Sequence, residues 1–154
     1  MESKVMKIVV PEGYEIDKEK STFENIVFKK VDEVVIKWRI DKVGVEIRAE
    51  GQHFVIDAES PSFHCPWDDA MRFYNTKASF DWKLPTVRQL HIIAKYIDKI
   101  NEVIRSNDGF EIKKWMWSCE EEDEFCAWGV SMGSGTTGSN YKGSPNYVRA
   151  VSAL

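Results

Sequence analysis

The residues with the clearest capacity for chemistry lie near the C-terminus. The stretch Gly129-Val130-Ser131-Met132-Gly133 has the spacing G-x-S-x-G, which in hydrolases places a nucleophilic serine on a turn between a strand and a helix. That chemistry also needs a later histidine, whereas His53, His64 and His91 all precede the serine. A stretch rich in glycine and threonine follows it instead of a helix pattern. The sequence therefore predicts no catalytic residues.

A second pattern overlaps the first. Gly133-Ser134-Gly135-Thr136-Thr137-Gly138 matches G-x-G-x-x-G, the loop that binds dinucleotide phosphates when a helix opens directly after it. No helix pattern opens after these glycines, so dinucleotide binding is not predicted. We expect the glycines to serve turns that need positive φ angles.

An acidic run precedes both patterns, with five negative charges from Glu120 to Glu124 at a predicted turn. Consecutive carboxylates lack the alternate spacing of an EF-hand loop, so no calcium site is predicted. The run is consistent with a solvated hairpin tip or with contact to a basic ligand or cation. The cysteines Cys119 and Cys126 flank the run and could meet across a hairpin, and no metal or other cofactor is expected.

The segment from Gly129 to Asn146 is polar, because 13 of its 18 residues are Gly, Ser, Thr or Asn. Tyrosine among small polar residues is typical of adaptable recognition surfaces. We expect Tyr141 to be exposed, whereas Phe125 could belong to that surface or pack on the core. The predicted ligand-binding residues are Glu121, Asp123, Phe125, Gly129, Ser131, Ser134, Thr136, Asn140, Tyr141 and Asn146.

Strands must frame this surface, since apolar alternation occurs on both sides of it. In the strand 127–132 we expect the large residues to point inward and the small ones outward. The predicted strands of the main domain are 34–40, 43–49, 53–58, 113–118, 127–132 and 146–153. Between them, 66–75 is a predicted short helix. A main helix begins after Thr86, which forms a capping box with Gln89, and its apolar stripe runs to about Arg105.

This order of strands, two helices and strands indicates an α+β fold with mixed and antiparallel pairing. The first residues lie outside it and have their own strand patterns at 4–10 and 25–30, with a charged loop or helical turn at 15–20. We expect a β-rich N-terminal extension at 1–33 and one domain at 34–154.

Composition excludes several classes of function. A net charge of −4 and a pI near 5.5 provide no basic surface for nucleic acid. No 18-residue apolar window predicts membrane insertion, and the apolar run at 5–10 is too short and polar for a signal peptide. Localisation stays open, because a leader could have been removed.

Six short motifs, in order and with the long helix in their midst, resemble bacterial C-type-lectin-fold domains. The similar proteins are gut-bacterial and phage domains of unassigned function and the variable proteins of diversity-generating retroelements. The motifs are Phe54-Val55-Ile56-Asp57-Ala58, Trp67-Asp68-Asp69-Ala70, Leu84-Pro85-Thr86, Trp117-Ser118-x-x-Glu121, Ala127-Trp128-Gly129-Val130 and Val148-Arg149-Ala150-Val151.

The resemblance covers about 43–154 and implies a C-type-lectin-like fold in which the N- and C-terminal strands pair. It also implies a ligand-binding face in the late loops and strands, diversified at Asn, Tyr, Ser and Gly positions. Cys119-Glu120 departs from the small hydroxyl pair usual there. Calcium-dependent sugar binding is not implied, since the Glu-Pro-Asn and Trp-Asn-Asp ligand motifs are absent from the sequence.

Together these observations predict a non-enzymatic module that binds a protein or glycan through its polar C-terminal surface. The alternative is a structural or assembly component of a phage or bacterial surface appendage, forming a homo-oligomer through the N-terminal extension. An enzyme of unrecognised type is a third alternative.

Overall fold

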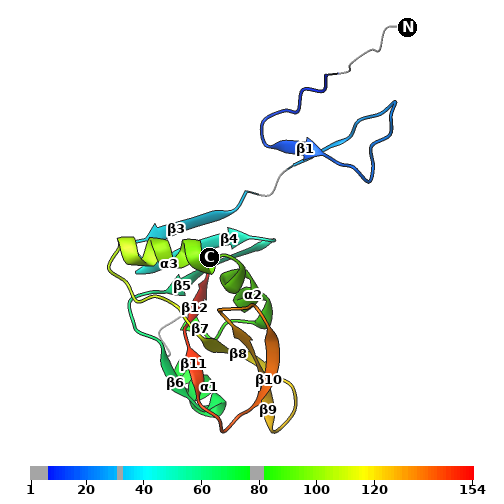
Figure 1. Cartoon of the computed structure of the whole chain (residues 1–154). Coiled ribbons are helices and arrows are strands. Elements are labelled where there is room, and N and C mark those ends of the chain that lie inside the picture. The colour runs from blue at the N-terminus through cyan, green and yellow to red at the C-terminus, as the bar shows by residue number, and fades with distance from the viewer. Residues whose placement is uncertain (1–6, 31–32, 77–81) are drawn as a thin grey trace, which may run out of the picture. The chain divides into compact units, whose positions relative to one another are not determined.

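A computed structural model describes residues 7–30, 33–76 and 82–154. The chain divides into two compact units, Met1–Glu33 and Val34–Leu154 (Figure 1). The second unit contains two five-stranded sheets and three helices within the described residues. The architecture is α+β, as predicted, and its strand pairs are antiparallel apart from one parallel pair.

The first unit is a small hairpin. Strands β1 (Tyr14–Ile16) and β2 (Phe28–Lys30) pair antiparallel, and Glu15 and Lys29 form an ion pair of 3.3 Å between them. The strand predicted at 4–10 is wrong for residues 7–10, which form no strand, and residues 4–6 lie outside the described range. Instead, the carbonyl of Pro11 accepts the amide of Tyr14 and closes a turn. Strand β1 begins at Tyr14 and extends into the segment 15–20 that was predicted as a loop or helical turn.

The first sheet of the second unit has the order β3-β4-β5-β12-β7. Its strands are β3 (Val35–Arg39), β4 (Gly44–Ala49), β5 (Gln52–Asp57), β12 (Val151–Ala153) and β7 (Trp82–Lys83). The β4–β5 hairpin has a two-residue loop, Glu50-Gly51, whose φ angles of 50° and 77° fit the turn that such hairpins favour. Alternation places Val45 and Ile47 in the core, both fully buried.

The second sheet has the order β10-β9-β8-β11-β6. Its strands are β10 (Thr137–Tyr141), β9 (Cys126–Ser131), β8 (Trp115–Glu121), β11 (Asn146–Val148) and β6 (Phe63–Cys65). The sequence did not predict β10, because its polar residues resemble a loop, nor β6 and β7, which are only three and two residues long.

Three helices cover the sheets: α1 (Trp67–Thr76), α2 (Val87–Lys95) and α3 (Ile97–Ser106). The prediction of one main helix is therefore wrong, although its capping box at Thr86 and Gln89 is present. The helix breaks at Tyr96, whose φ of −108° and ψ of 21° leave helical geometry. Its apolar stripe nevertheless continues, since Leu90 and Ile104 are both fully buried.

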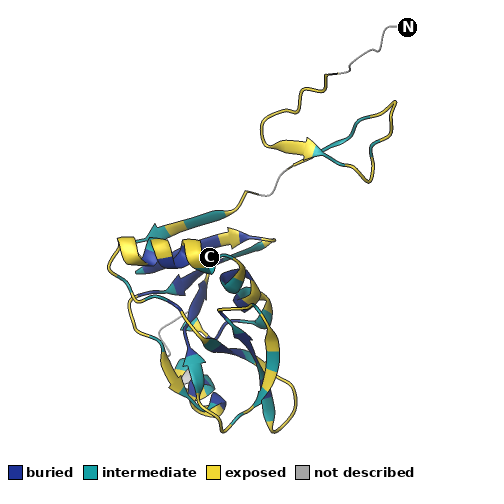
Figure 2. Ribbon diagram, in the orientation of Figure 1, coloured by how far each residue is buried: buried dark blue, intermediate teal, exposed yellow. Residues whose placement is uncertain are grey.

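Helices lie against both faces of the second sheet. Met116 and Val130 belong to the larger core, which includes residues of α2 and α3, whereas Trp117 and Ala127 pack with Trp67 of α1 in a smaller core. Figure 2 shows buried residues along the central strands and exposed ones at their ends. The small residues of β9 were predicted to point outward. That prediction is wrong, because a helix lies against this face of the sheet as well and Ala127 is fully buried.

The chain changes sheet near its end. One strand was predicted at 146–153, but β11 and β12 lie in different sheets, on a continuous path visible in Figure 1. Arg149 lies between them, 1% exposed, and donates to the carbonyls of Asp57 (2.8 Å), Phe110 (2.7 Å) and Glu111 (3.0 Å). It also donates twice to Ser62 Oγ, at 3.2 and 2.8 Å. These hydrogen bonds hold the chain where it passes from one sheet to the other, because the backbone carbonyls need donors and Arg149 supplies them.

Candidate functional site

The predicted ligand-binding residues fall into two groups at opposite ends of the β9–β10 hairpin. The aromatic end comprises Glu121, Asp123, Phe125 and Tyr141, and the hydroxyl turn comprises Ser131, Ser134 and Thr136. β10 is five residues long, so at about 3.4 Å per residue the two ends lie roughly 14 Å apart. The ten predicted residues therefore do not form one site.

Two aromatic rings are exposed at the aromatic end. Phe125 and Tyr141 are each 62% exposed. Tyr141 pairs with Cys126, the residue after Phe125, and the amide of Lys142 donates to the carbonyl of Phe125 at 2.8 Å. The backbone therefore holds both residues at the same end of the sheet. Large exposed apolar groups gathered at one place are typical of interaction surfaces.

The acidic run is partly committed to the fold. Glu121 forms an ion pair of 3.0 Å with Lys142, whose ammonium also lies 4.8 Å from the centre of the Trp67 ring. Asp123 Oδ1 accepts hydrogen bonds from the amides of Phe125 (2.8 Å) and Cys126 (2.7 Å), which shapes the turn. These two carboxylates hold the aromatic end in shape, and a ligand would compete with their present partners.

Glu120 has a separate role. It lies in an irregularity of β8, between Trp117 and Glu121, and its Oε2 accepts the amide of Val87 at 2.6 Å. That amide belongs to the first turn of α2, where a carboxylate is favoured by the helix dipole. Glu120, one of the two residues that depart from the lectin-like pattern, thus links β8 to α2.

Among the described residues, one group has the spacing of metal ligands. The donor atoms of Glu122, Asp123 and Cys126 lie within 4.8 Å of one another, and both acidic residues are exposed. Asp123 already accepts two amides, and exposed acidic groups are common without an ion. The expectation of no metal stays a prediction. Cys65, Cys119 and Cys126 are free thiols, so no disulfide joins the hairpin.

At the hydroxyl turn, the side chains bond to the turn itself. Ser131 Oγ accepts the amides of Gly133 and Ser134, both at 3.3 Å, and Ser134 Oγ donates to Thr136 Oγ1 at 2.9 Å. Next to it, His91 of α2 contacts the hydroxyl of Thr137. The hydroxyls therefore stabilise the loop, and Ser131 is not placed as a nucleophile.

The remaining predicted residues lie between or beyond these groups. Gly129 is buried: a Cβ there would lie 2.4 Å from Trp115 Nε1, so the glycine lets the indole approach β9 closely. Asn140 is half-buried in β10, opposite Ala127. Asn146 is half-buried on β11, which is separated from β9 by β8. None of the three presents a well-exposed side chain.

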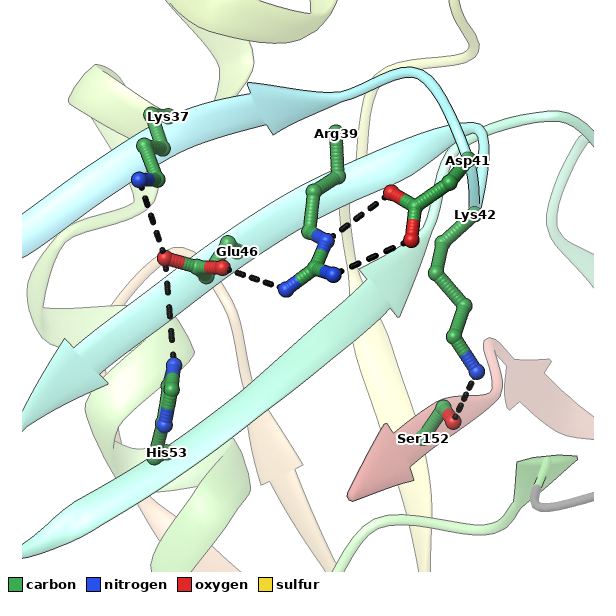
Figure 3. Close-up of polar contacts among 7 residues, drawn as sticks. All are labelled: Lys37, Arg39, Asp41, Lys42, Glu46, His53 and Ser152. Atoms are coloured by element: carbon green, nitrogen blue, oxygen red, sulfur yellow. Dashed lines mark hydrogen bonds and ion pairs between the residues drawn. The ribbon is translucent and has the colours of Figure 1, made fainter. Parts of the chain in front are cut away.

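Sequence reasoning missed a charged cluster on the first sheet (Figure 3). Glu46 is 8% exposed and contacts Arg39 Nη1 at 2.7 Å, Lys37 Nζ at 3.5 Å and His53 Nε2 at 3.8 Å. Arg39 also forms two bonds to Asp41, at 2.9 and 3.0 Å. Alternation in β4 places Glu46 opposite the core, but finding its partners required the β3–β4 register.

The electrostatics of this cluster follow from its pairing. Burial raises the pKa of Glu46, but the hydrogen bond from Arg39 and the charges of Lys37 and Arg39 outweigh it, and the pKa lies below its ordinary value. Glu46 is thus held ionised among cations and has no raised pKa that would suit a general acid. Through Glu46 the cluster connects side chains of β3, β4 and β5.

Comparison with known proteins gives one family. The model of the Lcl C-terminal domain, a family of bacterial and phage domains, matches residues 36–152. The match spans nearly all of the second unit and excludes the first. No curated protein matches the chain. None of the helices in residues 7–30, 33–76 and 82–154 combines the length and the hydrophobicity that a membrane span requires.

Proposed function

The chain belongs to the family of Lcl C-terminal domains, and from this premise we propose that it is a non-enzymatic module that binds a protein or glycan. The observation that carries the proposal is the pair of exposed rings at the aromatic end, Phe125 and Tyr141. Aromatic side chains supply large contact areas at low entropy cost, and they stack well on sugar rings or apolar protein surfaces. Binding of nucleic acid and insertion into a membrane are not part of the proposal.

The carboxylates around the rings add a preference among ligands. Glu122 and Glu124 are exposed beside Phe125, and Glu121 lies on the neighbouring strand. A negative surface steers cationic partners toward it and disfavours acidic ones. We therefore expect a neutral or basic ligand, whose binding weakens as salt concentration rises.

A screen of glycans and bacterial and host surface proteins tests the proposal. The wild-type chain is compared with a Phe125→Ser, Tyr141→Ser double variant, and Ile40→Ser serves as control because Ile40 is 84% exposed in the β3–β4 loop. We expect at least one ligand that the wild type and the control bind and the double variant loses. A ligand retained by all three proteins would place the binding surface elsewhere.

We further propose that the fold is C-type-lectin-like and that the second unit resembles retroelement variable proteins. In support, the terminal strand β12 joins the sheet of β3, β4 and β5, although it pairs with β5 and not with the first strand. On β10, Thr137, Ser139 and Tyr141 are exposed on an edge strand, where substitutions would not disturb the core. Genes encoding close variants that differ at these positions, beside a reverse transcriptase gene, would test the idea.

The alternative proposal is an assembly role, with the first unit joining copies of the chain. It is favoured by the exposed apolar residues of that unit, Val9 (86%) and Phe23 (87%). An isolated two-stranded hairpin is marginally stable in water, and units below about 40 residues usually need support from oligomerisation or cross-links. A chain that is monomeric at all concentrations would exclude this role.

A further inference from the structure

A pocket of about 400 Å³ lies apart from the aromatic end, between the loop that follows α3 and strand β11. Its volume is within the range of small-ligand sites. Its lining combines two aromatic rings, two lysines and a serine hydroxyl, together with Glu111 on the rim. The lining includes Ser62, Phe110, Glu111, Lys113, Lys114 and Tyr147.

The pocket wall is built from a firmly bonded loop. Buried Asn101 of α3 accepts the amide of Ile112 at 2.7 Å and donates to its carbonyl at 2.9 Å. Phe110 donates its amide to Ala58 at 3.0 Å, and Arg149 donates to the carbonyls of Phe110 and Glu111. These bonds fix the loop before any ligand arrives, which lowers the entropy cost of binding.

Lys114 is held in an unusual backbone conformation at the pocket. Its φ of 70° lies in the left-handed region, which a residue with a side chain adopts at some cost, and its carbonyl accepts the amide of Met132 at 2.9 Å. Its ammonium lies at Tyr147, with Nζ 3.2 Å from the phenol oxygen and 5.1 Å from the ring centre. A strained residue that orients a charge at a pocket points to a ligand.

The donors available in the pocket suit an anion. Ser62 Oγ accepts two N–H groups of Arg149, so its own proton is directed to another acceptor. The phenol oxygen of Tyr147 accepts from Lys114, which likewise leaves its proton to donate. Glu111, the acidic residue of the rim, is paired with Arg105 at 2.6 Å.

We propose that this pocket binds a ring that carries a carboxylate, with the carboxylate at Lys114 and the Ser62 hydroxyl and the ring against Phe110 and Tyr147. Phe110 is 48% exposed and available for such contact. The single charge of a carboxylate matches the Lys114 ammonium together with one or two hydroxyl donors, and the N–H groups of Arg149 are already bonded to the protein. Either a uronic-acid sugar or an aromatic acid has this chemistry.

Binding of four small probes to the full chain distinguishes these sources. Galacturonate is compared with galactose, and phenylacetate with phenylacetamide, by amide chemical shifts and calorimetry at millimolar concentrations. We expect one or both acids to shift the amides of Phe110, Lys114 and Tyr147, and each neutral relative to bind at least about tenfold more weakly. The acid that binds identifies the source of the carboxylate.

Two variants and a control locate the contact. Lys114→Gln should lose about tenfold in affinity, and Tyr147→Phe, which keeps the ring, should lose a smaller factor. Lys99→Gln, on the exposed face of α3, should bind as the wild type does. The proposal is overturned if neither acid shifts these amides, if acids and neutral probes bind equally, or if folded Lys114→Gln binds like the wild type. The Phe125→Ser, Tyr141→Ser variant should retain this binding, so failure of the function proposed above would not affect the result.

Discussion

At the scale of single residues, Arg149 is the most deeply buried charged side chain among the described residues, with 1% of its surface exposed. Burial lowers the pKa of its guanidinium, yet five hydrogen bonds to carbonyl and hydroxyl oxygens hold it in place between the two sheets. Replacement by a hydrophobic residue would leave three half-buried backbone carbonyls without this partner, at a cost of about 1–3 kcal/mol each.

We therefore expect Arg149→Met to lower the free energy of unfolding by about 3 kcal/mol or more, measured by urea denaturation. Arg48→Met is the control, because Arg48 is exposed on β4 and its change should cost less than about 0.5 kcal/mol. Equal effects of the two substitutions would show that Arg149 does not join the sheets.

Glu46 gives a prediction for pH dependence. Its pKa in the folded chain lies below the ordinary value of 4.5, so its pairing stabilises the fold above that pH and is lost as the pH falls through the lower folded value. We expect Glu46→Gln to be less stable than the wild type at pH 7, with the difference shrinking below about pH 4.5. Urea denaturation from pH 7 to pH 3 measures it, and a constant difference would contradict the assignment.

The sequence predicted the exposure of a side chain better than its hydrogen-bond partners. Tyr141 was predicted to be exposed and is, because a large ring among small polar residues on an edge strand has little to pack on. The commitment of Ser131 and Asp123 to their own turns could not be predicted, since it depends on backbone amides two and three residues away. The contact between Gly129 and Trp115 depends on the pairing of β8 with β9, so it could not be predicted from the local sequence either.

At the scale of elements, the start of α2 is fixed by a capping box. Thr86 Oγ1 accepts the amide of Gln89 at 3.1 Å, and the Gln89 side chain accepts the amide of Thr86 at 2.9 Å. We expect Thr86→Ala to cost about 1 kcal/mol in unfolding free energy and Thr86→Ser to cost much less, since serine keeps the accepting hydroxyl. Thermal and urea unfolding of both variants checks this, and equal losses would argue against the cap.

The edge strand β10 gives a prediction about tolerance. Ser139 is exposed, so Ser139→Tyr should change the free energy of unfolding by less than about 0.5 kcal/mol. Gly129→Ala should cost about 1–3 kcal/mol, because its Cβ would lie 2.4 Å from Trp115 Nε1 and 2.8 Å from the carbonyl oxygen of Met116. If Gly129→Ala proved as harmless as Ser139→Tyr, Trp115 would not be packed against β9 at Gly129.

Two element boundaries could not be read from the pattern. The break at Tyr96 has no glycine or proline to mark it, and the apolar stripe continues across it. The change of sheet at Arg149 also leaves alternation nearly unbroken, because both β11 and β12 need apolar residues. Tertiary packing decided both, so local periodicity predicted that strands and helices exist but not where each one ends.

At the scale of the whole molecule, the two units differ in how they are stabilised. The second unit has two apolar cores and the buried Arg149 between its sheets. In the first unit, none of the described residues is buried, and its hairpin has strands of three residues each. The cooperative free energy of folding should therefore arise within residues 34–154.

A chain that begins at Val34 should accordingly unfold in urea with the same midpoint as the full chain, because its cores are complete without the first unit. Sedimentation of both chains over a range of concentrations then separates the two proposed roles. If the full chain forms oligomers and the shorter chain is monomeric, the first unit joins the copies and an assembly role gains support. If both are monomeric and both bind the same ligand, binding needs only the second unit. A shorter chain that failed to fold would contradict the premise, since it would mean that the first unit completes a core.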